Sequence, residues 1–128
     1  MNQDKRQRNE ESPPYDICER TFQFATRIVK LCRRVENGWI ANGVLGKQML
    51  RSGTSIGANL EEGQAAQSRA DFVSKYSIAR KEARETNYWL RLITASGVSN
   101  DPEIPPLISE TEQLVKILTT IIKNAKRD

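Results

Sequence analysis

The sequence is built around Arg51-Ser52-Gly53-Thr54-Ser55-Ile56-Gly57-Ala58-Asn59-Leu60-Glu61-Glu62-Gly63, a stretch in which small residues recur at helical spacing. Gly53 and Gly57 lie four residues apart, so both fall on one face of the predicted helix. Each glycine inside a helix costs about 1 kcal/mol relative to alanine, and tight packing of a neighbouring backbone would offset that cost. The stretch therefore predicts a helix that another helix approaches closely.

Polar residues on this helix predict a structural network. A buried amide such as that of Asn59 must find hydrogen-bond partners or lose about 1 to 3 kcal/mol. One glutamate, such as Glu62, would pair with an arginine, such as Arg51 or Arg84, and fix the register of the helices. We therefore assign a structural role to eight positions: Arg51, Ser52, Gly53, Ser55, Gly57, Asn59, Glu62 and Gly63.

Apolar residues recur with a seven-residue period, which is typical of helices packed lengthwise. Helices are predicted over 15–36, from the loop at 39–43 to about 67, from 68 to 96 and from about 106 to 125. The predicted seams include Asn59 on the second helix and Ile121 on the fourth. The first helix carries two adjacent seams, one of Ile17, Phe24, Ile28, Leu31 and Val35 and one of Phe22, Ala25, Val29 and Cys32.

Capping residues support these boundaries. Gly38 is the expected left-handed cap of the first helix. Ser68 and Asp71 have the spacing of a capping box at the start of the third helix, which Gly97 closes. Pro106 suits the first turn of the fourth helix, after a proline-containing connector.

The pattern predicts an all-α fold, an antiparallel up-down-up-down four-helix bundle over residues 15–128. A helical hairpin array that closes its core only by oligomerising is the alternative, which the double seam of the first helix leaves open. Residues 1–14 are polar, carry balanced charge and end in Pro13-Pro14, so we expect a disordered leader there.

Composition restricts the classes of function. The 128 residues are 38% hydrophobic with a net charge of +4, lack the roughly 18 consecutive apolar residues of a membrane span, and begin with too polar a segment for a signal peptide. We therefore expect a cytoplasmic protein. Cys18 and Cys32 would lie about 21 Å apart on one helix, too far for a disulfide.

The chain contains no histidine, which argues against a zinc site or a histidine-activated nucleophile. Glu61, Glu62, Glu82 and Glu85 raise the possibility of a carboxylate metal site, but the Glu-x-x-His pattern of such bundles is missing. We predict a non-enzymatic protein without metal or cofactor.

Two arginine stripes are the candidate nucleic-acid-binding residues. Arg80, Arg84 and Arg91 follow one another along one face of the third helix with Asn87 beside them, and Arg20, Arg27 and Arg34 recur every seven residues on the first helix. Such stripes can follow a phosphate backbone. The competing interpretation is a solvated face, with Glu82 and Glu85 neutralising part of the charge.

Tyr88, Trp89 and Trp39 are the remaining large aromatic side chains. Trp89 lies one position from the seam of the third helix. Although it could stack on a base, packing against a helix or another subunit is the favoured interpretation.

Three segments resemble one known family: Leu50–Gly63 in full, Asp71-Phe72, and Ala79-Arg80-Lys81-Glu82-Ala83-Arg84-Glu85-Thr86-Asn87-Tyr88-Trp89-Leu90. They are similar to the bacterial four-helix-bundle proteins, also called 23S rRNA intervening-sequence proteins, over about residues 15–125, and more distantly to accessory proteins of diversity-generating retroelements. The resemblance implies a ring-like homopentamer with a role in nucleic-acid binding. Glu61 departs from the alanine of many members and makes that face more acidic.

The sequence thus favours a homo-oligomeric bundle that binds nucleic acid, RNA or DNA with RNA preferred, through basic stripes on the first and third helices. The alternative is a protein–protein scaffold or accessory subunit that makes no direct contact with nucleic acid.

Overall fold

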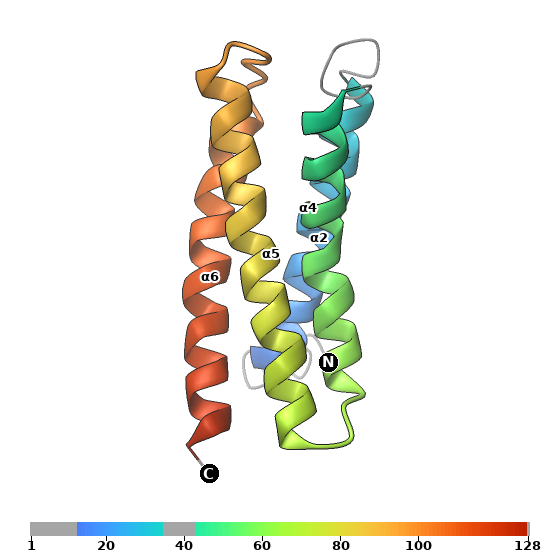
Figure 1. Ribbon diagram of the computed structural model, residues 1–128, viewed down its shortest axis with the longest axis vertical. Coiled ribbons are helices and arrows are strands. Elements are labelled where there is room, and N and C mark those ends of the chain that lie inside the picture. Colours follow the sequence, from blue (N-terminus) through green and yellow to red (C-terminus); the bar gives the residue numbers. More distant parts are fainter. Residues whose placement is uncertain (1–12, 35–42, 128) are drawn as a thin grey trace, which may run out of the picture.

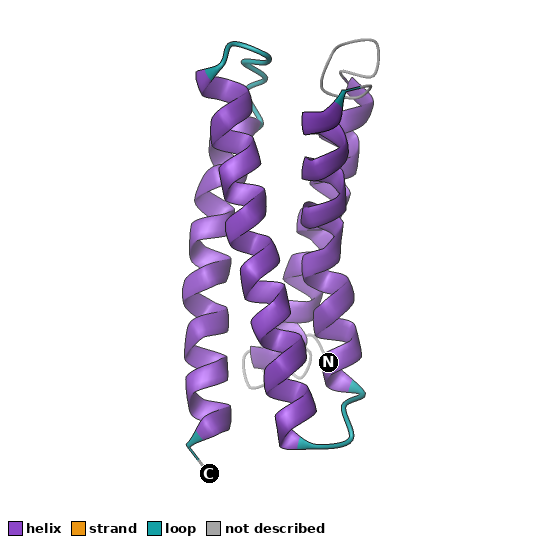
Figure 2. Ribbon diagram, in the orientation of Figure 1, coloured by secondary structure: helices purple, strands orange, loops and turns teal. Residues whose placement is uncertain are grey.

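The structure is a computed structural model that describes residues 13–34 and 43–127 (Figure 1). Within these residues the chain forms four long helices. They are α2 (Pro13–Arg34), α4 (Val44–Gln64), α5 (Arg69–Ala95) and α6 (Ile104–Lys126). Figure 2 shows that the described residues outside them form short connections. The helices alternate in direction, so that α2 starts and α6 ends at the same end of the bundle. The predicted all-α up-down-up-down four-helix bundle is confirmed.

The two ends of α5 follow the predicted capping chemistry. Ser68 has an extended backbone, and its hydroxyl accepts a hydrogen bond of 3.0 Å from the Asp71 amide. At the other end Gly97 adopts a φ of +78°, a left-handed conformation that glycine takes without strain. The Gly97 amide bonds to the Thr94 carbonyl and the Val98 amide to the Ile93 carbonyl, which is the Schellman arrangement.

Three other boundaries differ from the prediction by two or three residues. α2 begins at Pro13 and α6 at Ile104, because a first helical turn tolerates residues without an amide hydrogen, such as Pro105 and Pro106. α4 ends at Gln64, short of the predicted 67, since the chain must reverse before the extended Ser68. The predicted end of the first helix, the Gly38 cap, Trp39 and leader residues 1–12 lie outside the described residues.

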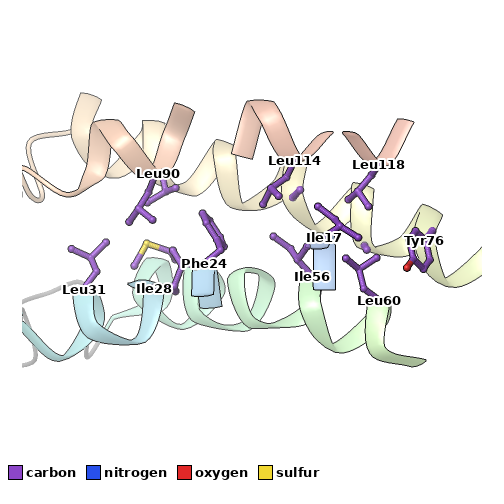
Figure 3. Packing of buried hydrophobic residues seen from close by; sticks show 14 of the residues in the cluster. Ile17, Phe24, Ile28, Leu31, Ile56, Leu60, Tyr76, Leu90, Leu114 and Leu118 are labelled. Carbon is purple, nitrogen blue, oxygen red and sulfur yellow. The ribbon is translucent and has the colours of Figure 1, made fainter. Parts of the chain in front are cut away.

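The core runs the length of the bundle and takes side chains from all four helices (Figure 3). Two predicted seam positions are wrong. Leu60, not Asn59, is fully buried on α4, and Ile122 replaces Ile121 on α6. In both cases the residue one position after the predicted one points into the core. Fully buried members include Phe24, Ile28, Leu31, Met49, Ile56, Leu60, Leu90, Ile93, Leu107, Leu114 and Leu118.

Glycines on α4 let two helices approach, as the sequence predicts. A Cβ at Gly53 would lie 3.0 Å from the Ile28 side chain of α2, and one at Gly57 would lie 3.2 Å from the Thr21 hydroxyl. Gly63 faces α5 instead, where a Cβ would lie 2.7 Å from the ring of Tyr76. These separations are shorter than ordinary carbon contacts of about 3.5 to 4.0 Å, so the missing side chains allow the packing.

Candidate nucleic-acid interface

The arginine stripe of α2 faces α6 and the connection that precedes it, where each guanidinium meets a carboxylate. Arg20 binds Glu110 through two hydrogen bonds of 2.6 and 2.9 Å. Arg27 lies 2.8 Å from Glu103. Arg34 binds both carboxylate oxygens of Asp101 at 3.1 and 3.2 Å. The three pairs form a ladder across the side of the bundle where the α2 and α6 backbones approach least closely among neighbouring helices.

These pairings change the charge that α2 presents. Hydrogen bonding to Glu110 raises the pKa of Arg20, and hydrogen bonding to Arg34 lowers the pKa of Asp101, as expected when opposite charges stabilise each other. Each arginine of this stripe therefore neutralises an acidic group of its own chain. The predicted binding of nucleic acid by Arg20, Arg27 and Arg34 would have to compete with these carboxylates.

The arginine stripe of α5 is different. Arg84 and Arg91 are exposed and Arg80 is half-buried, and within the described residues none of the three forms an ion pair. Arg80 donates a hydrogen bond of 3.3 Å to the Thr119 hydroxyl of α6, which leaves its positive charge uncompensated. This stripe keeps the charge that a phosphate contact requires.

A groove of about 460 Å³ runs beside this stripe between α5 and α6. Asn87 connects the two sides of the groove. Its amide donates to the Thr111 hydroxyl of α6 at 2.8 Å, and its side-chain carbonyl accepts from Arg91 of α5 at 2.7 Å. Lys116 of α6 adds a third cation to Arg84 and Arg91. The full lining is Arg84, Asn87, Arg91, Thr111, Glu112, Val115 and Lys116.

The sequence identified the α5 side of this groove but missed Lys116. Lys116 follows a seam position of α6 by two residues and carries no signal by itself. Only the packing of α6 against α5 places it near Arg84 and Arg91. The groove carries three cations against the single carboxylate of Glu112, so its chemistry suits an anionic ligand.

Several of the eight positions assigned a structural role connect α4 to α5 or to α2. Arg51 binds Glu82 at 3.3 Å and also pairs with Glu85, and Glu85 accepts a 3.0 Å hydrogen bond from the Trp89 indole. The buried Ser52 hydroxyl lies 2.8 Å from the hydroxyl of Thr86. This part of α4 therefore fixes the register of α5 through polar contacts.

The remaining polar positions have local partners. The Ser55 hydroxyl donates to the Arg51 carbonyl at 2.6 Å, and the half-buried Asn59 amide donates to the Ser55 carbonyl at 2.9 Å. Glu62 pairs with Lys75 at 3.0 Å, whereas the glutamate–arginine pair that the sequence suggested is formed by Arg51 with Glu82 and Glu85. Trp89 packs against the core, whereas Tyr88 is 49% exposed.

A second surface, between α2 and α4, is apolar. Phe22 is 60% exposed and Val29 39% exposed, so the predicted second seam of α2 is only partly covered within this chain. Phe22 also lines a groove of about 460 Å³ together with Ala25, Thr54, Gly57, Ala58 and Glu61. Exposed apolar surface of this kind is typical of contacts with another protein chain.

Comparisons with known proteins agree with the fold. The model of the 23S rRNA-intervening sequence protein family matches residues 14–120. A crystal structure of a protein of unknown function from the S23 ribosomal protein family of Bacteroides thetaiotaomicron is 40% identical, and the match covers 87% of this chain and 98% of that chain with a TM-score of 0.79. No curated protein matches the chain. None of the helices in the described residues has the length and apolarity to cross a membrane.

Proposed function

The chain belongs to the 23S rRNA-intervening sequence protein family, and we propose that it is a non-enzymatic protein that binds RNA along α5. The observation that carries this proposal is the contrast between the two arginine stripes. The α2 stripe is matched by carboxylates of α6 and of the residues just before it, whereas Arg80, Arg84 and Arg91 form no ion pair among the described residues. Uncompensated charge is what displaces counterions from a phosphate backbone.

The geometry of the stripe suits an extended ligand. Arg80 and Arg91 are eleven residues apart, which corresponds to about 16 Å along a helix. Lys116 faces the same path across the groove. Several phosphates can therefore contact one protein chain at the same time, and each contact makes the affinity more sensitive to salt.

We also propose that the protein assembles with itself as a homopentamer, the assembly that the family resemblance implies. The exposed Phe22 and Val29 of α2 support this part of the proposal. Assembly would repeat the α5 groove on each subunit and strengthen the electrostatic field. Light scattering should show a higher mass than one chain, and Phe22→Ser should lower it. Val44→Ser is the matched control, because Val44 is 68% exposed and lies outside the groove.

RNA binding is tested by the salt dependence of fluorescence anisotropy with a labelled RNA. Replacing Arg80, Arg84 and Arg91 with glutamine should weaken binding and reduce the slope of log affinity against log salt by about 2, since each single-strand phosphate contact contributes about 0.7. The control replaces the exposed Lys30, Arg33 and Lys47 with glutamine, which removes the same charge elsewhere. Equal slopes in the two triple variants would contradict the assignment to α5.

The second candidate is a scaffold for another protein, which the apolar groove at Phe22 supports. A partner held by apolar contacts should bind with little dependence on salt. Binding of such a partner that is lost in Phe22→Ser and kept in the α5 triple variant, in a protein that does not bind RNA, would favour the scaffold.

A further inference from the structure

One aromatic side chain, Tyr88, lies on the solvent face of α5 between Arg84 and Arg91, two arginines that form no ion pair within the described residues. Tyr88 follows Arg84 by four residues and precedes Arg91 by three, so the three side chains lie on one face. About half of the Tyr88 side chain is exposed, 49%. The structural role of this helix is fulfilled by its opposite face, where Ala83, Leu90 and Ile93 are fully buried.

Trp89 and Arg91 both contact the Tyr88 ring, which stays 49% exposed. Its edge meets the Trp89 ring at a centroid distance of 5.1 Å and an angle of 73°, and Trp89 is tied to Glu85 by its indole hydrogen bond. The Arg91 guanidinium lies over the ring as a cation–π contact, 5.8 Å from its centroid, and is oriented by Asn87, so a stacking base uses the part of the ring that Arg91 leaves exposed. A ring held by its neighbours loses little conformational freedom when a ligand binds.

We propose that the α5 site binds single-stranded RNA, with an unpaired base stacked on Tyr88 and the adjoining phosphates on Arg84 and Arg91; this inference rests on the RNA binding proposed above. Aromatic rings beside a basic groove are the common means of holding single strands, because every base has a flat face. In a duplex those faces are already stacked on each other, and a protein contacts mainly the backbone and the minor groove.

The spacing along the helix supports the arrangement. Arg84 and Arg91 lie about 10 Å apart along the axis and Tyr88 lies between them. The cation of Lys116 on the far side of the groove can hold the strand where it leaves the tyrosine. A single strand can turn one base toward the protein while the phosphates on either side of that base contact arginines, whereas the bases of a duplex are paired and stacked.

The test compares one short oligoribonucleotide, labelled and free of self-pairing, with the same strand annealed to its complement. Wild-type protein should bind the single strand about tenfold more tightly, and Tyr88→Ala should weaken that binding by about 5- to 150-fold, the usual range for losing one stacking contact. Tyr88→Phe keeps the ring and should bind as the wild type does. Duplex binding should change little in either variant.

The result separates the two proposals. If the single strand and the duplex bind equally and Tyr88→Ala changes neither, stacking on Tyr88 is wrong, while loss of binding in Arg84→Gln/Arg91→Gln would still support RNA binding on α5. If neither form of RNA binds wild-type protein, both proposals fail. Circular dichroism melts of all variants show whether each remains folded, and an unfolded Tyr88→Ala is replaced by Tyr88→Leu, which removes the aromatic face and keeps apolar bulk.

Discussion

Gly63→Ala should destabilise the protein although alanine is the better helix former. The added methyl group would lie 2.7 and 2.8 Å from two ring carbons of Tyr76, and ordinary contact needs about 3.5 to 4.0 Å. The ring would have to move by about 1 Å. It has no room to do so, since it is fully buried, stacks on Phe72 at a centroid distance of 4.1 Å and accepts a hydrogen bond from Gln64.

The magnitude follows from two opposing effects. Overpacking of a rigid core costs about 1 to 3 kcal/mol, and replacing glycine in a helix returns up to about 1 kcal/mol. We expect a net loss of about 1 to 2 kcal/mol, which lowers the melting temperature by about 4 to 8 °C. Thermal and urea unfolding followed by circular dichroism measure both quantities.

A double-mutant cycle identifies the cause. In the background Tyr76→Leu, which removes the ring, Gly63→Ala should be neutral or stabilising by up to about 1 kcal/mol, so the two changes are coupled. If Gly63→Ala raised the melting temperature of the otherwise unchanged protein, the close approach of α4 and α5 at this glycine would be refuted.

Three further predictions concern ionisable groups. Burial raises the pKa of Tyr76 to about 12, above its ordinary value of about 10. The stability that the neutral Tyr76 hydroxyl contributes is therefore complete below pH 10 and is lost as the pH rises from 10 to 12. Tyr76→Phe should remove this alkaline loss of stability in urea unfolding. Arg34 lowers the pKa of Asp101, so that pair stabilises the fold above the ordinary pKa and loses its effect as the pH falls below it; Asp101→Asn should flatten the acid limb of stability. Arg51→Gln leaves the buried Glu82 without its partner and should lower the free energy of unfolding by about 1 to 2 kcal/mol, less than the loss of a fully buried pair because Arg51 is half exposed. Arg84→Gln, the matched control, should leave the melting temperature nearly unchanged.

The helices and most of their ends were predictable because they depend on local chemistry. Ser68 caps α5 through its own hydroxyl and Gly97 ends it through its own backbone, and neither needs information from elsewhere in the chain. The choice between Ile121 and Ile122 was not predictable in this way. Both are apolar and both fit a helical repeat, so the packing of α6 against its neighbours selects Ile122.

The candidate site was predictable only in part for the same reason. Arg27 and Arg84 look alike in the sequence, each on a periodic basic stripe of an amphipathic helix. What separates them is the residue opposite: Glu103, the N-cap of α6, for Arg27, and solvent for Arg84. That difference depends on contacts between residues far apart in the chain, which periodicity does not report.

The small residues of α4 explain why the two stripes have different roles. Gly53 and Gly57 bring α4 against α2, and Gly63 brings it against α5, so α4 holds both neighbours closely while α2 and α6 stay further apart. Long arginine side chains can span the wider separation between α2 and α6. Arg20, Arg27 and Arg34 do so through their ion pairs. α2 and α6 close the wide side through these pairs, whereas Arg84 and Arg91 form no ion pair among the described residues, which is the feature on which the RNA binding proposed above rests.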